Sequence, residues 1–103
     1  MEKIEKLKSF LIQSPDDSFL KHALALEYVK TGDISEAKKI FLDVLTRDPS
    51  YIGTYYHLAK LFESSGDPES AKLWYEKGMV VSKVTGDQKT FHELAAALED
   101  LTE

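Results

Sequence analysis

The sequence predicts an all-α protein, an α-solenoid of antiparallel helix pairs with about six helices. Apolar residues recur at the spacing of one helix face along most of the chain. Short turns that contain glycine and aspartate separate these stretches. The stretches also repeat with a period of 34 residues, which is typical of helical repeat proteins. Because 103 residues is the size of one domain, we expect a single domain over residues 1–103.

The repeat becomes visible when the sequence is shifted against itself by 34 residues. The paired positions then carry identical or similar residues, most of them apolar or turn-forming. The pairs are Leu24 with Leu58, Ala25 with Ala59, Tyr28 with Phe62, Gly32 with Gly66, Asp33 with Asp67, Ala37 with Ala71, Lys38 with Lys72, Phe41 with Tyr75 and Leu45 with Met79. These matches predict one repeat over residues 17–49 and a second over residues 51–84.

Each repeat is expected to consist of two helices joined by a tight turn. The helices are predicted near 17–31 and 34–47 in the first repeat, and near 51–65 and 68–84 in the second. Gly32 and Gly66 can take the left-handed conformation that closes a helix. Asp33 and Asp67 follow them and are placed to cap the next helix, with Pro68 tolerated in its first turn. Turns this short make the two helices pack antiparallel.

Two further helices are expected beside the repeats. Leu11 stands 34 residues before Leu45, so the helix near 2–13 corresponds to the second half of a repeat. Downstream the period becomes 36 residues. In that register Phe91, Leu94, Ala95 and Leu98 correspond to Tyr55, Leu58, Ala59 and Phe62. We therefore expect an N-terminal half-repeat helix at 2–13 and a C-terminal capping helix at 88–101, whose acidic residues suit a solvent-facing side.

Composition argues against several classes of function. Thirteen basic and eighteen acidic residues give a net charge of −5, which disfavours binding to nucleic acid phosphates. The chain has no cysteine, which excludes disulfides, thiolate metal sites and cysteine nucleophiles. No apolar run approaches the roughly 20 residues that span a membrane, and the charged residues 1–6 do not resemble a signal peptide. We therefore expect a cytoplasmic protein that binds neither nucleic acid nor membrane.

No catalytic constellation is evident in the sequence. His92-Glu93 begins like a zinc protease motif, but Ala96 stands where the second histidine is required. There is no glycine-rich phosphate loop, and no serine lies in the context of a nucleophile elbow. We therefore expect no enzymatic activity and no cofactor.

The repeat resembles that of the tetratricopeptide repeat family, whose signature places leucine, a small residue and an aromatic on the first helix, and alanine, an aromatic and a closing proline on the second. The first repeat supplies Leu24, Ala25, Tyr28, Ala37, Phe41 and Pro49; the second supplies Leu58, Ala59, Phe62, Ala71 and Tyr75, with Gly78 and Lys83 in place of Val44 and Pro49. The small residues let neighbouring helices approach closely. The resemblance implies a right-handed superhelix, a concave groove lined by the first helix of each repeat, and a non-catalytic role in binding other proteins.

Helical periodicity carries this groove over to ten candidate residues for binding a peptide or protein segment. They are Phe19, His22, Leu26, Lys30, Tyr56, His57, Lys60, Lys89, His92 and Glu93, and Val29, Glu63, Ser64 and Ala96 lie on the same face. Some members of the family hold the carboxylate tail of heat-shock chaperones with lysines, asparagines and an arginine. Of the corresponding positions here, only Lys89 keeps the expected type, and Glu93 has the wrong charge for a carboxylate. The resemblance therefore points to a partner of another kind.

Two alternatives to simple partner binding remain open. The chain could be a structural protein that forms a homo-oligomer, in which the basic-leaning helix near 2–13 pairs with the acidic helix near 88–101 of another copy. His22, His57 and His92 share the predicted groove and could hold a divalent metal ion or sense pH near 6.5. Three histidines without a carboxylate or thiolate partner are more often solvated, so we expect no metal site.

Overall fold

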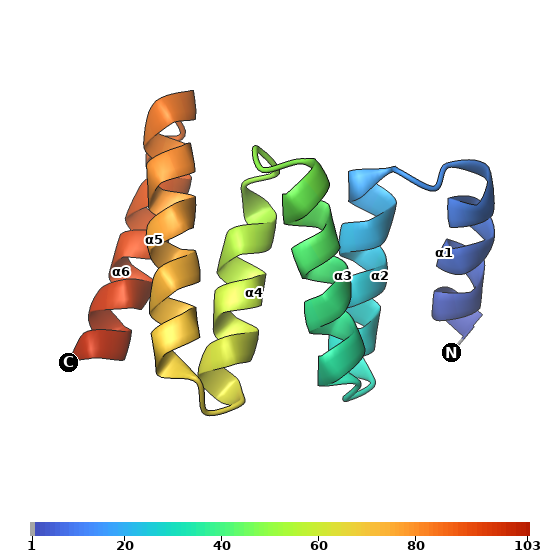
Figure 1. Ribbon diagram of the computed structural model, residues 1–103, viewed down its shortest axis with the longest axis horizontal. Helices are drawn as coiled ribbons and strands as arrows, with labels where there is room; N and C mark the ends of the chain where they lie inside the picture. Colours follow the sequence, from blue (N-terminus) through green and yellow to red (C-terminus); the bar gives the residue numbers. More distant parts are fainter. Residues whose placement is uncertain (1) are drawn as a thin grey trace. The chain divides into compact units, whose positions relative to one another are not determined.

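The computed structural model describes residues 2–103, which form six α-helices and no strand (Figure 1). The helices are α1 (Glu2–Gln13), α2 (Ser18–Lys30), α3 (Ile34–Arg47), α4 (Gly53–Ser64), α5 (Pro68–Thr85) and α6 (Gln88–Thr102). All six predicted helices are present, and the all-α fold class is confirmed.

Two helix starts differ from the prediction for a local reason, and four helix ends differ from it by one residue. Asp17 lies outside α2 because its backbone is extended, and its side chain accepts a hydrogen bond from the Leu20 N–H at 3.0 Å. Asp17 is therefore the cap of this helix and not its first residue. The helix α4 begins at Gly53, two residues later than expected. Before it, the carbonyls of residues 51 and 52 accept hydrogen bonds from the N–H groups of residues 54 and 55, which is the three-residue spacing of a turn and not the four-residue spacing of an α-helix.

The predicted turns and caps are confirmed. Gly32 and Gly66 have φ angles of +84° and +83°, in the left-handed region that favours glycine. Asp33 and Asp67 cap α3 and α5 through their side chains. Asp87, to which the sequence analysis gave no such role, caps α6 by accepting from both the backbone N–H and the hydroxyl of the residue three positions later, at 3.0 and 2.8 Å.

The described chain divides into two compact units, Met1–Asp48 (unit 1) and Pro49–Glu103 (unit 2). Within unit 1, α2 and α3 form an antiparallel pair and α1 packs against α2 (Figure 1). Within unit 2, α4 and α5 form the antiparallel pair, and α6 packs against α5 and also contacts α4. Each unit thus contains one helix pair and one additional helix.

The small residues of the repeat lie where helices meet. Ala25, Ala37, Ala59 and Ala71 are all completely buried. In unit 2, a core cluster unites Ala59 and Ala71 with the side chains of α5 and α6 that pack around them, which are Tyr75, Leu94 and Ala97. The expectation that alanine permits close helix packing at these positions agrees with this burial.

Gly78 is a second point of close approach, and it explains one departure from the repeat signature. A Cβ atom at this position would lie 2.7 Å from the Cβ of Tyr55 and 2.8 Å from the Cδ1 of Leu94. The backbone of α5 therefore contacts side chains of both α4 and α6 at one place. Glycine stands here because no larger residue leaves room for both neighbours.

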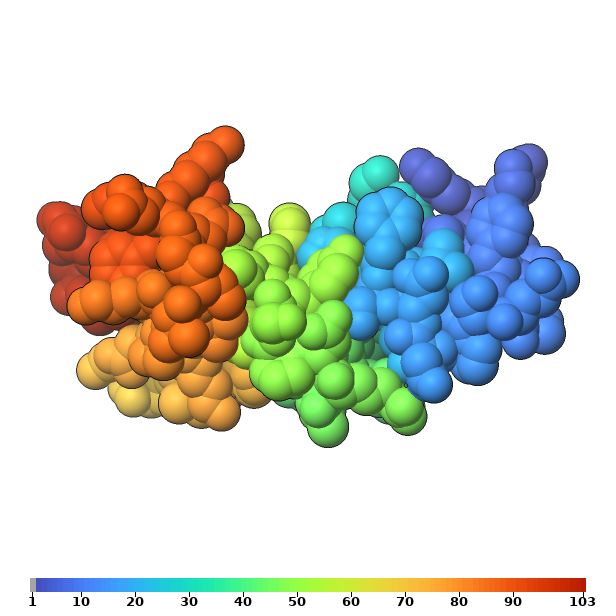
Figure 2. All heavy atoms as spheres, turned by 90° about the horizontal axis from the view of Figure 1, so that it is seen from above, coloured from blue at the N-terminus to red at the C-terminus, as the bar shows by residue number. Residues whose placement is uncertain are grey.

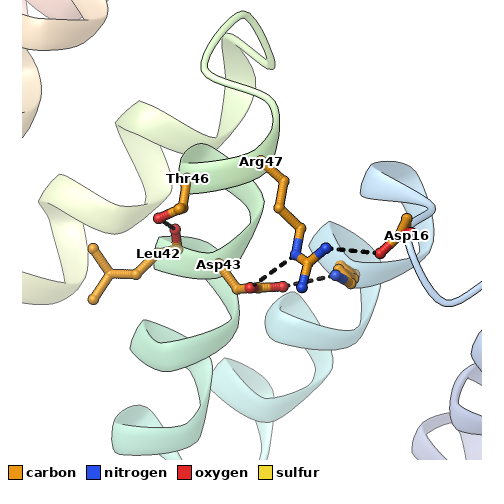
Figure 3. Close-up of polar contacts among 6 residues, drawn as sticks. Asp16, Leu42, Asp43, Thr46 and Arg47 are labelled. Carbon is orange, nitrogen blue, oxygen red and sulfur yellow. Dashed lines mark hydrogen bonds and ion pairs between the residues drawn. The ribbon is translucent and has the colours of Figure 1, made fainter.

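Unit 1 carries a polar cluster on the surface of its helix pair (Figure 3). The Lys21 ammonium on α2 donates to Asp43 on α3 at 2.7 Å. Arg47 donates to the same carboxylate at 3.2 Å and to Asp16 at 2.9 Å. The hydrogen bond from Lys21 is the first reason that the pKa of Asp43 lies below its ordinary value. The cluster joins both helices to the turn that precedes α2.

Candidate functional site

A hollow of about 490 Å³ lies between α4 and α6 of unit 2 and brings several predicted groove residues together. Its lining consists of Tyr56, Lys60, Glu93, Ala96, Ala97 and Asp100. Four of these residues, Tyr56, Lys60, Glu93 and Ala96, belong to the face predicted from the sequence. We call this hollow the α4–α6 hollow.

Tyr56 forms a fixed aromatic wall of the α4–α6 hollow. Its ring packs against the ring of Tyr75 at a centroid distance of 6.3 Å, and it lies on the core cluster of unit 2. The Lys60 ammonium lies over the Tyr56 ring, 5.6 Å from its centroid. Because core packing holds the ring, a partner that contacts it would immobilise little additional side-chain freedom.

Lys60 and Glu63 connect this wall to the core. Their side chains form an ion pair at 3.7 Å, and the Tyr75 hydroxyl donates to Glu63 at 2.9 Å. Burial, together with this hydrogen bond to a carboxylate, raises the pKa of the Tyr75 phenol above its usual range. The positive charge of Lys60 is therefore already paired in unit 2.

The carboxylates of α6 are in a different situation. Glu93 and Asp100 are exposed and lie two helical turns apart, with Ala96 and Ala97 between them. Among residues 2–103, no ion pair forms to either of them. The α6 side of the hollow is thus a small apolar strip with an unpaired negative charge near each end.

The other predicted residues of unit 2 lie outside this hollow. His57 is half-buried, and burial lowers the pKa of its imidazole. Lys89 and His92 are exposed at the beginning of α6. His92 lines a separate hollow of about 360 Å³ where α5 ends and α6 begins. The residues of this region are coloured orange in Figure 2.

In unit 1 the predicted residues are all on α2. The Phe19 side chain is 67% exposed, whereas Leu26 is half-buried. His22 packs against Phe41 at a ring-centroid distance of 5.3 Å. Lys30 forms an ion pair with Glu27 at 3.1 Å. A hollow of unit 1, of about 370 Å³, is lined by other residues, namely Leu11, Lys21, Leu24, Glu36, Lys39, Ile40 and Asp43.

No group of three histidine, aspartate or glutamate side chains is placed to hold a metal ion within the part of the chain that the structure describes. Over the same residues, no helix combines the length and apolarity that crossing a bilayer requires.

Ala97 and Asp100 also line the α4–α6 hollow, although they are not among the residues predicted for the groove. Asp100 is one of the acidic residues that the sequence predicts on the solvent-facing side of the helix at 88–101. Its spacing of seven residues from Glu93 was a usable signal, since residues seven apart lie on the same face of a helix.

Comparison with known proteins fits this architecture. The family model described as tetratricopeptide repeat matches residues 20–51 and 52–79, which together are more than half of the chain. The chain belongs to the tetratricopeptide repeat family. The family resemblance inferred from the sequence is thereby confirmed.

Solved structures extend the likeness. A tetratricopeptide repeat domain protein from Salinibacter ruber is 38% identical, with a TM-score of 0.81 over 84% of this chain and 88% of the other. A protein from Bordetella parapertussis is 27% identical, with a TM-score of 0.84 over 96% and 86% of the two chains. PcrH, solved with the chaperone binding region of PopD, shares only the fold, at 14% identity and a TM-score of 0.87 over 96% and 75%. A search of curated proteins gave no match.

Proposed function

We propose that this tetratricopeptide repeat protein is a non-catalytic interaction module that binds a segment of another protein in the α4–α6 hollow. The observation that carries the proposal is the meeting of Tyr56, Lys60 and Glu93 around one hollow of about 490 Å³. Proteins of this family bind protein partners and are in general not catalytic, which supports the same conclusion. That PcrH, with the same fold, was solved with a segment of PopD also agrees with it.

The shape of the hollow suits a side chain of a partner. Ala96 and Ala97 are small, so no large side chain fills the hollow between the two carboxylates, while Tyr56 offers an aromatic surface on the other side. Aromatic residues that are held in place and surrounded by small contacts are typical of binding hot spots. A partner that inserts an apolar or aromatic stem here would bury area on both helices.

The charges of the hollow favour a basic partner segment. Lys60 is paired with Glu63, whereas Glu93 and Asp100 have no ion pair among residues 2–103. A lysine or arginine of the partner would pair with these carboxylates, and the tyrosine ring would contribute a cation–π contact. We therefore expect binding to weaken as salt is added, because dissolved ions screen the attraction between exposed charges. The Debye length at physiological salt is about 8–10 Å, and it shortens as the salt concentration rises.

The test is to capture partners from a lysate of the source organism with the wild-type protein and with Ala96→Arg. Ala96 is exposed, and arginine is a good helix former, so the variant should fold while its side chain fills the hollow with positive charge. We expect the captured partner to be lost, and calorimetry with the identified segment to show at least a tenfold weaker affinity.

Leu73→Arg is the matched control. Leu73 is 47% exposed on α5 and does not line the hollow, so the same side chain introduced there should leave capture unchanged. If Ala96→Arg captures the same proteins as the wild type, the partner does not use the α4–α6 hollow and the proposal is wrong.

A further inference from the structure

Within unit 2, one face of α6 has no helix packed on it, whereas the equivalent face of α4 is covered by α5. In the 36-residue register, Phe91 and Ala95 correspond to Tyr55 and Ala59. Tyr55 and Ala59 are 4% and 0% exposed, and α5 packs against α4. Phe91 and Ala95 are only half-buried, because within unit 2 no helix occupies on α6 the position that α5 has on α4 (Figure 1).

A shallow apolar hollow marks this uncovered position. Its volume is about 370 Å³, and it lies between α5 and α6. It is lined by Glu76, Met79, Val80, Lys83, Phe91 and Leu98. Val80 is 64% exposed, although it is apolar and adjoins other apolar side chains. The face is therefore shaped to take the apolar side of one more helix.

The helix α1 corresponds to the second helix of a repeat and also has an uncovered apolar side. In the 34-residue register, Leu7 and Phe10 correspond to Phe41 and Val44 of α3. The α3 residues are 0% and 1% exposed, and α3 packs against α2, the first helix of its repeat. In α1, Phe10 is 51% exposed and Leu7 is half-buried. Thus α1 has the register of a second repeat helix, and the side that would meet a first repeat helix is open.

Charge supports pairing of these two faces. A second repeat helix packs antiparallel to the first, so the beginning of α1 would lie beside the end of α6. In the first half of α1, Lys3 and Lys6 are spaced to share the helix face of Phe10, whereas Glu2 and Glu5 fall on the neighbouring face. Glu99 and Glu103 are at the end of α6. Lys6 and Glu99 have no ion pair within residues 2–103, so both charges are available to a neighbour.

We infer that α1 of one copy of this protein packs on the uncovered face of α6 of a second copy, so that the two helices complete one tetratricopeptide repeat. Phe10 of one copy then lies near Phe91 and Ala95 of the other. The contact is heterologous, because each copy presents both faces, and it adds copies head to tail. This surface is separate from the α4–α6 hollow, which lies on another side of α6.

The test combines two variants, each with one face blocked. Phe10→Glu places a charge on the α1 face, and Ala95→Arg places bulk and charge on the α6 face. Light scattering coupled to gel filtration should show a wild-type mass that rises with concentration and two variants that remain monomers. An equimolar mixture of the variants should form a one-to-one dimer and grow no further, because one intact α6 face and one intact α1 face remain.

Ile12→Glu is the control, since Ile12 is 82% exposed on the opposite side of α1 from Phe10. It should associate like the wild type, and circular dichroism should show unchanged helicity for every variant. The inference is overturned if the wild type stays monomeric at the highest soluble concentration. It is also overturned if Ile12→Glu abolishes association as completely as Phe10→Glu does, or if the mixed variants fail to dimerise.

Discussion

Replacing Gly78 by alanine tests the packing of unit 2 at a place where the backbone of α5 approaches side chains of α4 and α6 closely. The added methyl would lie 2.7 Å from the Tyr55 Cβ and 2.8 Å from the Leu94 Cδ1. Carbon atoms pack at about 3.5–4.0 Å, so roughly 1 Å of space must open on two sides. The Tyr55 Cβ is attached directly to the backbone of α4, and Leu94 is completely buried, so neither neighbour can rotate away.

The net cost follows from two opposing effects. Overpacking of this kind costs about 1–3 kcal/mol. Alanine is better than glycine in a helix interior by about 0.5–1 kcal/mol, which offsets part of that cost. We therefore expect Gly78→Ala to lower the free energy of unfolding by up to about 2.5 kcal/mol, and the Tm by about 4–8 °C for each kcal/mol.

The assay is chemical denaturation followed by circular dichroism, with Gly53→Ala as the matched control. A Cβ at Gly53 meets nothing within 4 Å, and α4 begins at this residue. That variant should be as stable as the wild type or more stable by up to about 1 kcal/mol. If Gly78→Ala unfolds at the same denaturant concentration as Gly53→Ala, the close approach of α4, α5 and α6 at this residue is wrong.

Three further predictions follow from single residues. Ala37→Leu should lower the free energy of unfolding by about 1–3 kcal/mol through overpacking, and an unchanged Tm would contradict the packing of α3. The phenol of Tyr75 should resist alkaline ionisation because burial and Glu63 raise its pKa; ultraviolet absorbance should show one late-titrating phenol fewer in Tyr75→Phe, and an unchanged number would refute the assignment. Burial lowers the pKa of His57 from its ordinary value of 6.5, so the folded state binds its proton less readily than the unfolded state. Stability should therefore be intact above that pH and decline as the pH falls below it, and denaturation of His57→Gln should show a smaller decline.

The sequence alone was sufficient for the helices and their order. The 34-residue period places Leu24 and Leu58 in equivalent helices, and the turn residues Gly32-Asp33 and Gly66-Asp67 mark where those helices end and begin. This information is local, since a left-handed glycine and a capping aspartate act on the residues beside them. Helix periodicity also identified the completely buried alanines, because a repeat must keep small residues wherever its helices touch.

Tertiary structure was needed to decide which of the exposed groove residues share one hollow. Tyr56, Lys60 and Glu93 lie around the α4–α6 hollow, whereas His92, one residue earlier on α6, lines a separate hollow at the α5–α6 turn. Neighbours along a helix point about 100° apart, so a face assigned from periodicity covers more residues than one site can use. The bond from Tyr75 to Glu63 and the contact of Gly78 with Leu94 depend on helices that are distant in sequence, and only their packing brings those atoms together.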